Sequence, residues 1–387
     1  MNLRLLSLAF APFAFGTSAF VFVGLIDPMA VDLQVGVPMV GQLQTVFAVA
    51  CGLGGPILAR LLGGFDRKRL LMMVLAGLVL LNIATALVSD FQAIAAIRFA
   101  GGLFAALTLP LASTIAATLV PEAKRPEAFA TVLAGYTLAF LVGLPAGSVL
   151  GDAFGWQAAF WFGAVICALA LVIIALVTPG NIQAPSLSGV SFKAALRGDN
   201  VRLMMITMLG FLATFSTIAY IGPVITETTG ITGAGIGGVQ LATGVGSLLG
   251  LPAGAMFARL PARRALAGLL SMTLAMQVLF SLGMMLELGA AALPLLVLVM
   301  SLGSAALFAC SPVIQTRLAR SAGPAATLAF ALNGSMIFFG QGLGASAGGL
   351  TIAHAGLAWV GIAGACAAAI GLLVIWSLRP PVPAAGS

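Results

Sequence analysis

Charged residues are scarce in this chain of 387 residues. Asp, Glu, Lys and Arg together make up 7% of the sequence, whereas a soluble domain carries about 25%. Apolar residues make up 61%. A soluble globular protein and a disordered chain are both excluded, because each would need many more charges in contact with water. The composition therefore predicts an integral membrane protein.

Residues that carry metal, disulfide or catalytic chemistry are also few. The four cysteines (Cys51, Cys167, Cys310, Cys366) fall inside apolar runs without a CxxC pair, so neither a disulfide framework nor a metal site is expected. His354 is the single histidine and lies in a predicted turn. We expect no strand followed by a nucleotide-binding glycine loop. An enzyme is therefore not expected, no cofactor is expected, and any uphill transport must be driven by ions.

Apolar runs of about 20 residues, long enough to cross a bilayer as a helix, recur along the whole chain. They lie near 7–30, 40–62, 70–89, 92–119, 128–150, 157–178, 201–226, 235–258, 265–286, 291–316, 323–350 and 357–378. The pattern predicts an all-α membrane protein with twelve transmembrane helices. A polar linker over 179–200 divides it into two pseudo-symmetric six-helix halves, 1–178 and 201–379, and a disordered tail follows over 380–387.

The positions of the basic residues predict the topology. Of the 17 lysines and arginines, all but Arg98 fall at loops on one side of the twelve-helix weave. Lys and Arg are enriched in cytoplasmic loops, so both termini and the central loop are predicted to be cytoplasmic, in a bacterial inner membrane. The net charge of +7 is then a topology signal, and no nucleic-acid partner is expected.

Small residues recur at every fourth position in the predicted helices over 128–150 and 235–258. Both helices contain the sequence GLPAG, at 143–147 and 250–254. This spacing places the small residues on one helix face, and such faces let helices pack closely in lipid. We expect the two faces to meet across the interface between the halves as a moving contact; static packing is the alternative. The candidate residues are Gly143, Pro145, Gly147, Gly246, Gly250, Pro252 and Gly254.

The glycine-rich helices follow an order along the chain. Each is the second helix of a group of three, and each carries its glycines toward its C-terminal end. Besides the two GLPAG runs, these glycines are Gly54 and Gly55 before Pro56, and Gly340, Gly344 and Gly348. Consecutive groups cross the membrane in opposite directions, so the flexible ends alternate between its two faces. This symmetry indicates a transporter with one gate on each face.

Several stretches resemble the major facilitator superfamily, and more closely its bacterial drug/proton antiporter branch, which includes sugar and purine efflux proteins. They are LQTVFAVACGLGGPILARL (43–61), GGFDRKRLL (63–71), RFAGG (98–102), GLPAGSVLGDAFGWQAAFW (143–161) and the segment 312–349. The resemblance implies the major facilitator fold, a small-molecule substrate, and coupling to protons. It also points to Asp66, Arg67 and Arg69 in the basic turn, where the superfamily's usual acidic residue is replaced by Gly63.

The resemblance further implies that the first, fourth, seventh and tenth helices line the substrate cavity. Their aromatic candidates are Phe15, Phe20, Phe22, Phe104, Phe211, Phe215, Tyr220 and Phe308. Such a lining favours small amphipathic molecules or drugs over sugars, which need many polar partners. We expect a monomeric, proton-coupled efflux antiporter. Sugar or nucleoside export, uptake or facilitated diffusion on the same fold, and, less favoured, a membrane sensor that does not transport are the alternatives.

Arg98 is the basic residue that falls inside a predicted span. It lies about 12 Å from Asp90, at ~1.5 Å per helical residue, and a cation at such depth needs a partner inside the bundle. Asp27, roughly 7 Å inside the same membrane face, is the nearest acid by depth. We predict that Asp27 and Arg98 pair in one conformational state and that Asp27 takes up the coupling proton. A permanent clasp, or an Asp27 that only caps a helix end before Pro28, is the alternative.

Overall fold

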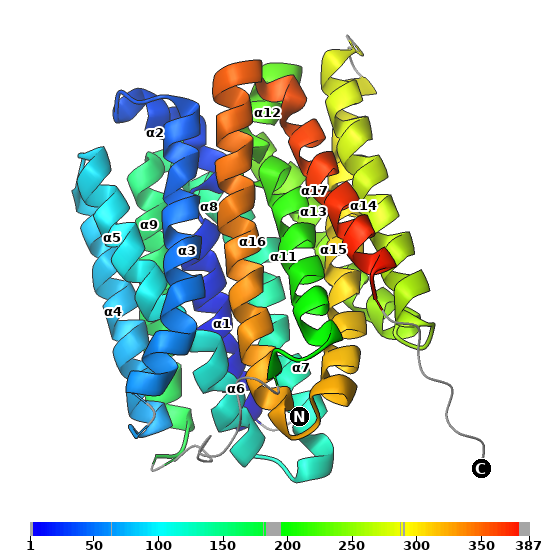
Figure 1. Cartoon of the computed structure of the whole chain (residues 1–387). Helices are drawn as coiled ribbons and strands as arrows, with labels where there is room; N and C mark the ends of the chain where they lie inside the picture. Colours follow the sequence, from blue (N-terminus) through cyan, green and yellow to red (C-terminus); the bar gives the residue numbers. More distant parts are fainter. Residues whose placement is uncertain are drawn as a thin grey trace.

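A computed structural model of the chain describes residues 3–62, 64–180, 182, 195–286, 288 and 291–378. Within these residues, twelve helical segments are long and apolar enough to cross a membrane. They stand side by side in one bundle (Figure 1), which confirms the predicted all-α membrane architecture. Gly63, most of the predicted linker (183–194) and the predicted tail (380–387) lie outside the described residues.

The N-terminal half contains the following helices, some of which follow one another within a single span. They are α1 (Leu3–Phe20), η1 (Val23–Leu25), α2 (Ile26–Asp32), α3 (Val37–Leu61), α4 (Arg67–Leu87), α5 (Phe91–Ala105), α6 (Thr108–Thr118), α7 (Arg125–Leu138), the π-helix η3 (Ala139–Gly143), α8 (Leu144–Phe154) and α9 (Trp156–Val177). The C-terminal half contains α11 (Asp199–Ile218), α12 (Ile221–Thr229), α13 (Ala234–Phe257), α14 (Ala262–Met285), α15 (Ala292–Ala322), α16 (Ala326–Ala355) and α17 (Val360–Trp376).

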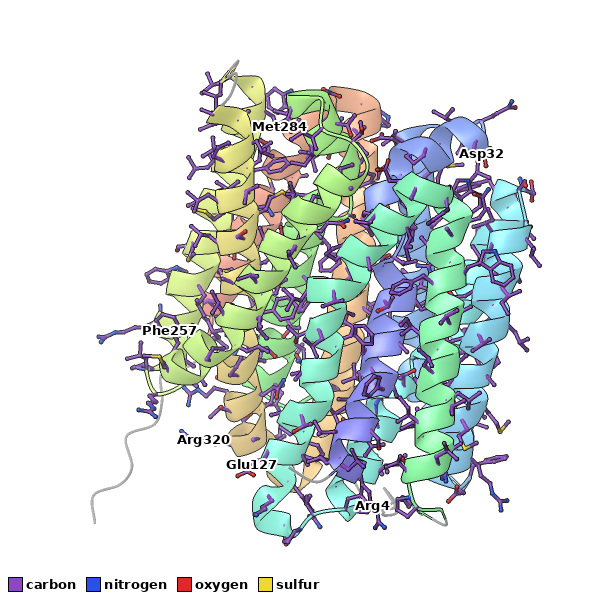
Figure 2. All side chains as sticks on the ribbon, turned by 180° about the vertical axis from the view of Figure 1, so that it is seen from behind. Arg4, Asp32, Glu127, Phe257, Met284 and Arg320 are labelled. Carbon is purple, nitrogen blue, oxygen red and sulfur yellow. The ribbon has the colours of Figure 1, made fainter. Side chains whose placement is uncertain are left out.

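The two ends of the bundle differ in charge. Figure 2 shows Arg4, Glu127 and Arg320 at one end and Asp32 and Met284 at the other. The loops rich in Lys and Arg belong to the first of these ends, which we call the basic end. The other is called the opposite end.

The first and seventh predicted helices are each broken in their part nearer the opposite end. The first is interrupted between Phe20 and Ile26, and the seventh between Ile218 and Ile221. The two breaks lie against each other, because a Cβ added at Gly222 would come within 3.2 Å of a backbone carbonyl oxygen at Gly24. The halves therefore touch backbone to backbone at this level.

The two helices with the stripes of small residues do meet across the halves, since a Cβ added at Gly237 of α13 would lie 3.2 Å from the carbonyl oxygen of Pro145. The prediction that the two stripes themselves face each other was wrong. A Cβ added at Gly147 would lie 2.5 Å from the carbonyl oxygen of Val21, which shows that α8 packs on the chain after α1. A Cβ at Gly250 would lie 2.4 Å from the carbonyl oxygen of Ala305, so α13 packs on α15. Gly143 faces Thr17 in the same way as Gly147 faces Val21. Four-residue spacing predicts which face is small, but not which neighbour it meets.

The remaining glycine-rich helices pack by the same rule. A Cβ at Gly54 of α3 would lie 3.3 Å from the Leu103 Cα in α5, and one at Gly344 of α16 would lie 2.7 Å from the carbonyl oxygen of Leu212 in α11. Each glycine-rich helix is therefore fixed closely to a partner in its own half. Such contacts tie each half together as a close-packed unit.

Candidate transport pathway between the two halves

Aromatic rings from both halves meet at the centre of the bundle. The ring centroids of Phe20 and Phe215 are 5.7 Å apart, and those of Phe140 and Phe308 are also 5.7 Å apart. These separations are typical of favourable aromatic pairs. The central aromatic cluster consists of Phe15, Phe20, Tyr136, Phe140, Phe211, Phe215, Phe308 and Phe338. Because rings from opposite halves contact one another, the cluster closes the pathway at this level.

Five of the eight predicted cavity aromatics belong to this cluster: Phe15, Phe20, Phe211, Phe215 and Phe308. The prediction missed Tyr136, Phe140 and Phe338, because it considered four helices only. The Tyr136 hydroxyl is a polar group within the cluster, and Gln341 Nε2 donates a hydrogen bond of 3.2 Å to it. This bond also joins the halves.

The other three predicted aromatics lie elsewhere. Phe104 packs against Gly77 of α4 and is 43% exposed, so it lies on the outside of the bundle and does not line a central cavity. Tyr220 is fully buried between the halves, against Gly41 of α3, and its hydroxyl donates to the Ala345 carbonyl at 2.9 Å. It therefore seals the interface. Phe22 contacts Arg98.

The opposite end is closed by polar contacts as well. The side-chain amide of Gln240 in α13 has partners when its nitrogen donates to Ser148 Oγ of α8 at 2.8 Å and its oxygen accepts from the Gly24 N–H at 3.2 Å. All three residues are buried. A buried amide with its hydrogen bonds made stabilises the arrangement, and separating the halves would leave it without partners.

Asp152 makes a second polar contact between the halves. It lies near the C-terminal end of α8, and its Oδ2 accepts a hydrogen bond of 3.1 Å from the N–H of Ala234, the first residue of α13. A carboxylate is stabilised at a helix N-terminus, where N–H groups lack intrahelical acceptors. The contact holds α8 against α13 at the opposite end.

Arg98 lies on α5 and is buried. Its guanidinium donates to the carbonyl oxygens of Ser18 at 2.8 Å and Ala19 at 2.6 Å, in the last turn of α1. Its Cζ also lies 4.9 Å from the ring centroid of Phe22 and 4.2 Å from that of Phe47. Helix C-terminal carbonyls and ring faces both attract a cation, so the charge is stabilised here without a carboxylate.

The predicted pair of Asp27 and Arg98 is not formed in this conformation, since neither residue takes part in the ion pairs found among the described residues. Asp27 is half-buried in the first turn of α2. Its carboxylate lies beside Thr226 and near Glu227, both on α12. Asp27 thus sits at the interface between the halves.

The basic turn after α3 makes its contacts within the N-terminal half. Asp66 caps α4 by accepting from the Arg69 N–H at 2.8 Å, and it also accepts from the N–H of Ile182, after α9, at 2.6 Å. Arg67 donates to the Leu62 carbonyl at 3.4 Å. The turn therefore fastens α4 to the chain after α9.

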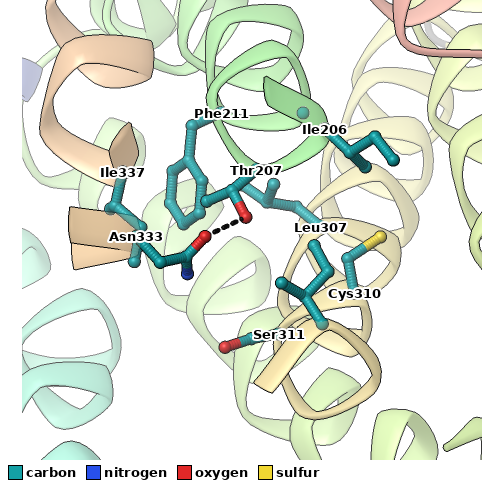
Figure 3. Close-up of a pocket in the computed structure, with 10 residues that line it drawn as sticks. Ile206, Thr207, Phe211, Leu307, Cys310, Ser311, Asn333 and Ile337 are labelled. Carbon is teal, nitrogen blue, oxygen red and sulfur yellow. Dashed lines mark hydrogen bonds between the residues drawn. The ribbon is translucent and has the colours of Figure 1, made fainter. Parts of the chain in front are cut away.

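A small pocket opens among α11, α15 and α16 and holds about 300 Å3 of empty space, its mouth included. Figure 3 shows Thr207, Asn333 and Ser311 around it, together with the ring of Phe211. Thr207 and Asn333 are buried. The prediction from sequence missed these polar residues, although an amide inside an apolar helix is itself a signal of a specific polar contact.

Among the described residues, twelve candidate spans form two halves that meet in close contact, which is the architecture of a membrane transporter. The chain belongs to the Major Facilitator Superfamily, whose family model matches residues 7–327. It is 30% identical to the Inner membrane transport protein YdhP of Escherichia coli (strain K12) over 378 residues, 97% of this chain and 96% of that protein.

Two further likenesses are informative. The chain is 34% identical to the Chloramphenicol resistance protein of Streptomyces lividans over 269 residues, 68% of this chain and 69% of that protein. Its fold is similar to the crystal structure of a D-xylose-proton symporter, with a TM-score of 0.74 and 15% sequence identity over 98% of both chains. The first concerns sequence, whereas the second supports the fold alone.

Proposed function

We propose that this transporter is a proton-coupled efflux antiporter for small amphipathic organic molecules, and that it works by alternating access. The observation that carries the proposal is the central aromatic cluster, in which rings from the two halves meet. When the halves separate on one side, the cluster opens into two aromatic walls. Such walls suit apolar bodies and offer few partners to a sugar.

The proposal includes an orientation in the membrane. The basic end faces the cytoplasm of a bacterial inner membrane, in keeping with the enrichment of Lys and Arg in cytoplasmic loops and with the likeness to an inner membrane transport protein. The opposite end, with its contacts around Gln240 and Asp152, is then the outer gate. Because one chain holds both halves, a monomer suffices.

Asp27 is the proposed coupling site. It is half-buried on α2 and contacts α12 of the other half. Its charge therefore affects the free energy of separating the two halves. In one of the two states, Asp27 approaches Arg98. An opposite charge favours the ionised carboxylate, so the proton taken up at the outer face is held or released as this distance changes.

The test uses inside-out membrane vesicles with an acidic interior and radiolabelled chloramphenicol, ethidium or xylose. The protein should drive accumulation of chloramphenicol or ethidium, and a protonophore should abolish it. The Asp27→Asn variant should keep binding and downhill exchange but lose the pH-driven accumulation. Gradient-driven movement of xylose alone would point to a sugar carrier, and transport by Asp27→Asn at the unmodified rate would place the proton elsewhere.

A further inference from the structure

A set of polar side chains lies about one helical turn nearer the basic end than the central aromatic cluster. Three neighbouring helices contribute to it, α11, α15 and α16. On each of them a member of the cluster lies within one to one and a half helical turns of the polar residue. These pairs are Thr207 and Phe211, Ser311 and Phe308, and Asn333 and Phe338. The polar side chains therefore border the pocket beneath the cluster.

The hydrogen bonds of these side chains leave donors for a ligand. Thr207 Oγ1 donates to Asn333 Oδ1 at 2.8 Å, which turns the Asn333 amide nitrogen toward the pocket (Figure 3). Ser311 Oγ accepts from Gln315 Nε2 at 3.0 Å, so its own hydroxyl proton is available to donate. The pocket thus presents N–H and O–H groups to an entering molecule.

The rest of the lining is apolar and uncharged. Ile206, Leu307, Ile314 and Ile337 form the walls, and none of the ten described lining residues carries a charge. A charged group would lose its hydration here without gaining an ion pair. A neutral molecule with an acceptor oxygen beside an apolar body would bury its apolar surface and also satisfy the free donors.

We propose that Asn333, with Ser311, forms a recognition subsite for the acceptor oxygen of neutral solutes such as amides, ketones and esters. The subsite rests on the proposed function and deepens it, because it adds a polar selectivity that the aromatic cluster lacks. In the proposed orientation it lies on the cytoplasmic side of the cluster, where an exported solute enters. Thr207 is a positioning residue that sets the direction of the Asn333 amide.

Two probes separate this subsite from general apolar binding. Chloramphenicol is neutral and carries an amide carbonyl, whereas tetraphenylphosphonium is an apolar cation without hydrogen-bonding atoms. Binding of each radiolabelled probe is measured on the purified full chain and on three variants. Asn333→Leu removes the amide but keeps the branched shape of the side chain. Ser311→Ala removes one hydroxyl while it leaves the bond between Thr207 and Asn333 intact. Ser335→Ala is the matched control, since Ser335 faces Gly55 of α3.

Asn333→Leu should raise the Kd for chloramphenicol about tenfold, as expected for one lost hydrogen bond to a buried group, and leave that for tetraphenylphosphonium unchanged. Ser311→Ala should raise the chloramphenicol Kd about two- to fivefold, and Ser335→Ala should change neither. If Asn333→Leu does not fold, the change in chloramphenicol Kd caused by Ser311→Ala tests the subsite. An equal rise in the Kd of both probes, or an unchanged Kd for chloramphenicol, would overturn the subsite while the proposed function stands. If the unmodified chain binds neither probe, the proposed substrate class and the subsite fail together.

Discussion

Arg98 brings a cation to a place where a transmembrane helix ends within the bundle. The carbonyls of Ser18 and Ala19 lie in the last turn of α1, where helical donors run out, and the guanidinium supplies two N–H groups in a fork. The break in the first span and the buried arginine therefore account for each other.

This account predicts the stability of Arg98 variants. Arg98→Met leaves two buried carbonyls without donors, at about 1–3 kcal/mol each, and should lower the melting temperature in detergent. Arg98→Lys should lie between Met and the unmodified chain, because an ammonium cannot reproduce the planar fork. The measurement is thermal unfolding of all three proteins. A higher melting temperature for Arg98→Met would show that burying the cation destabilises the fold by more than its hydrogen bonds stabilise it.

At the scale of helices, glycines divide into two groups with different expected effects. Gly147 and Gly250 contact helices of their own half, whereas a Cβ at Gly244 of α13 would lie 2.7 Å from Phe140 O in the other half. Gly147→Leu and Gly250→Leu should therefore reduce the yield of folded protein. Gly244→Leu should fold but transport poorly, since it blocks closure at the interface. The exposed Gly238, with nothing within 4 Å, provides the control as Gly238→Leu.

Yield, monodispersity and vesicle transport are measured for all four variants. Normal transport by Gly244→Leu would mean that η3 and α13 need not approach closely. Normal yield with lost transport for Gly147→Leu would revive the original interpretation of the stripes as a moving contact.

Helix number and type could be predicted from this sequence, because a long apolar run has few alternatives in a membrane. The partners of the helix faces could not. The spacing of Gly143 and Gly147 defines a face, but several neighbouring helices could meet it. The break after Phe20 was missed because no proline marks it, and so the carbonyl partners of Arg98 were missed as well. Ring positions such as Phe104 could be assigned to a helix, but not to its inner or outer side.

At the scale of the molecule, two close-packed halves meet through a central aromatic cluster and through contacts at the opposite end. Glycines such as Gly147 and Gly250 join helices within one half. Contacts at Gly222, Gly244, Gln240, Asp152 and Tyr220 join one half to the other. Rigid halves with breakable cross-contacts are what rocking between two open states requires. The structure is the state in which the opposite end is closed.

The most direct test of alternating access is a pair of distances measured by double electron–electron resonance. Cys51, Cys167 and Cys310 are buried and Cys366 is exposed, so Cys366→Ser provides the background. Spin labels go on the exposed pair Val31→Cys and Thr232→Cys at the opposite end or, separately, on the exposed pair Glu127→Cys and Arg320→Cys at the basic end.

Both distances are recorded at neutral and acidic pH, with and without chloramphenicol. The account predicts a population in which the opposite-end distance lengthens while the basic-end distance shortens, with its share changed by pH or solute. Two distances that stay constant under every condition, or that lengthen and shorten together, would contradict it.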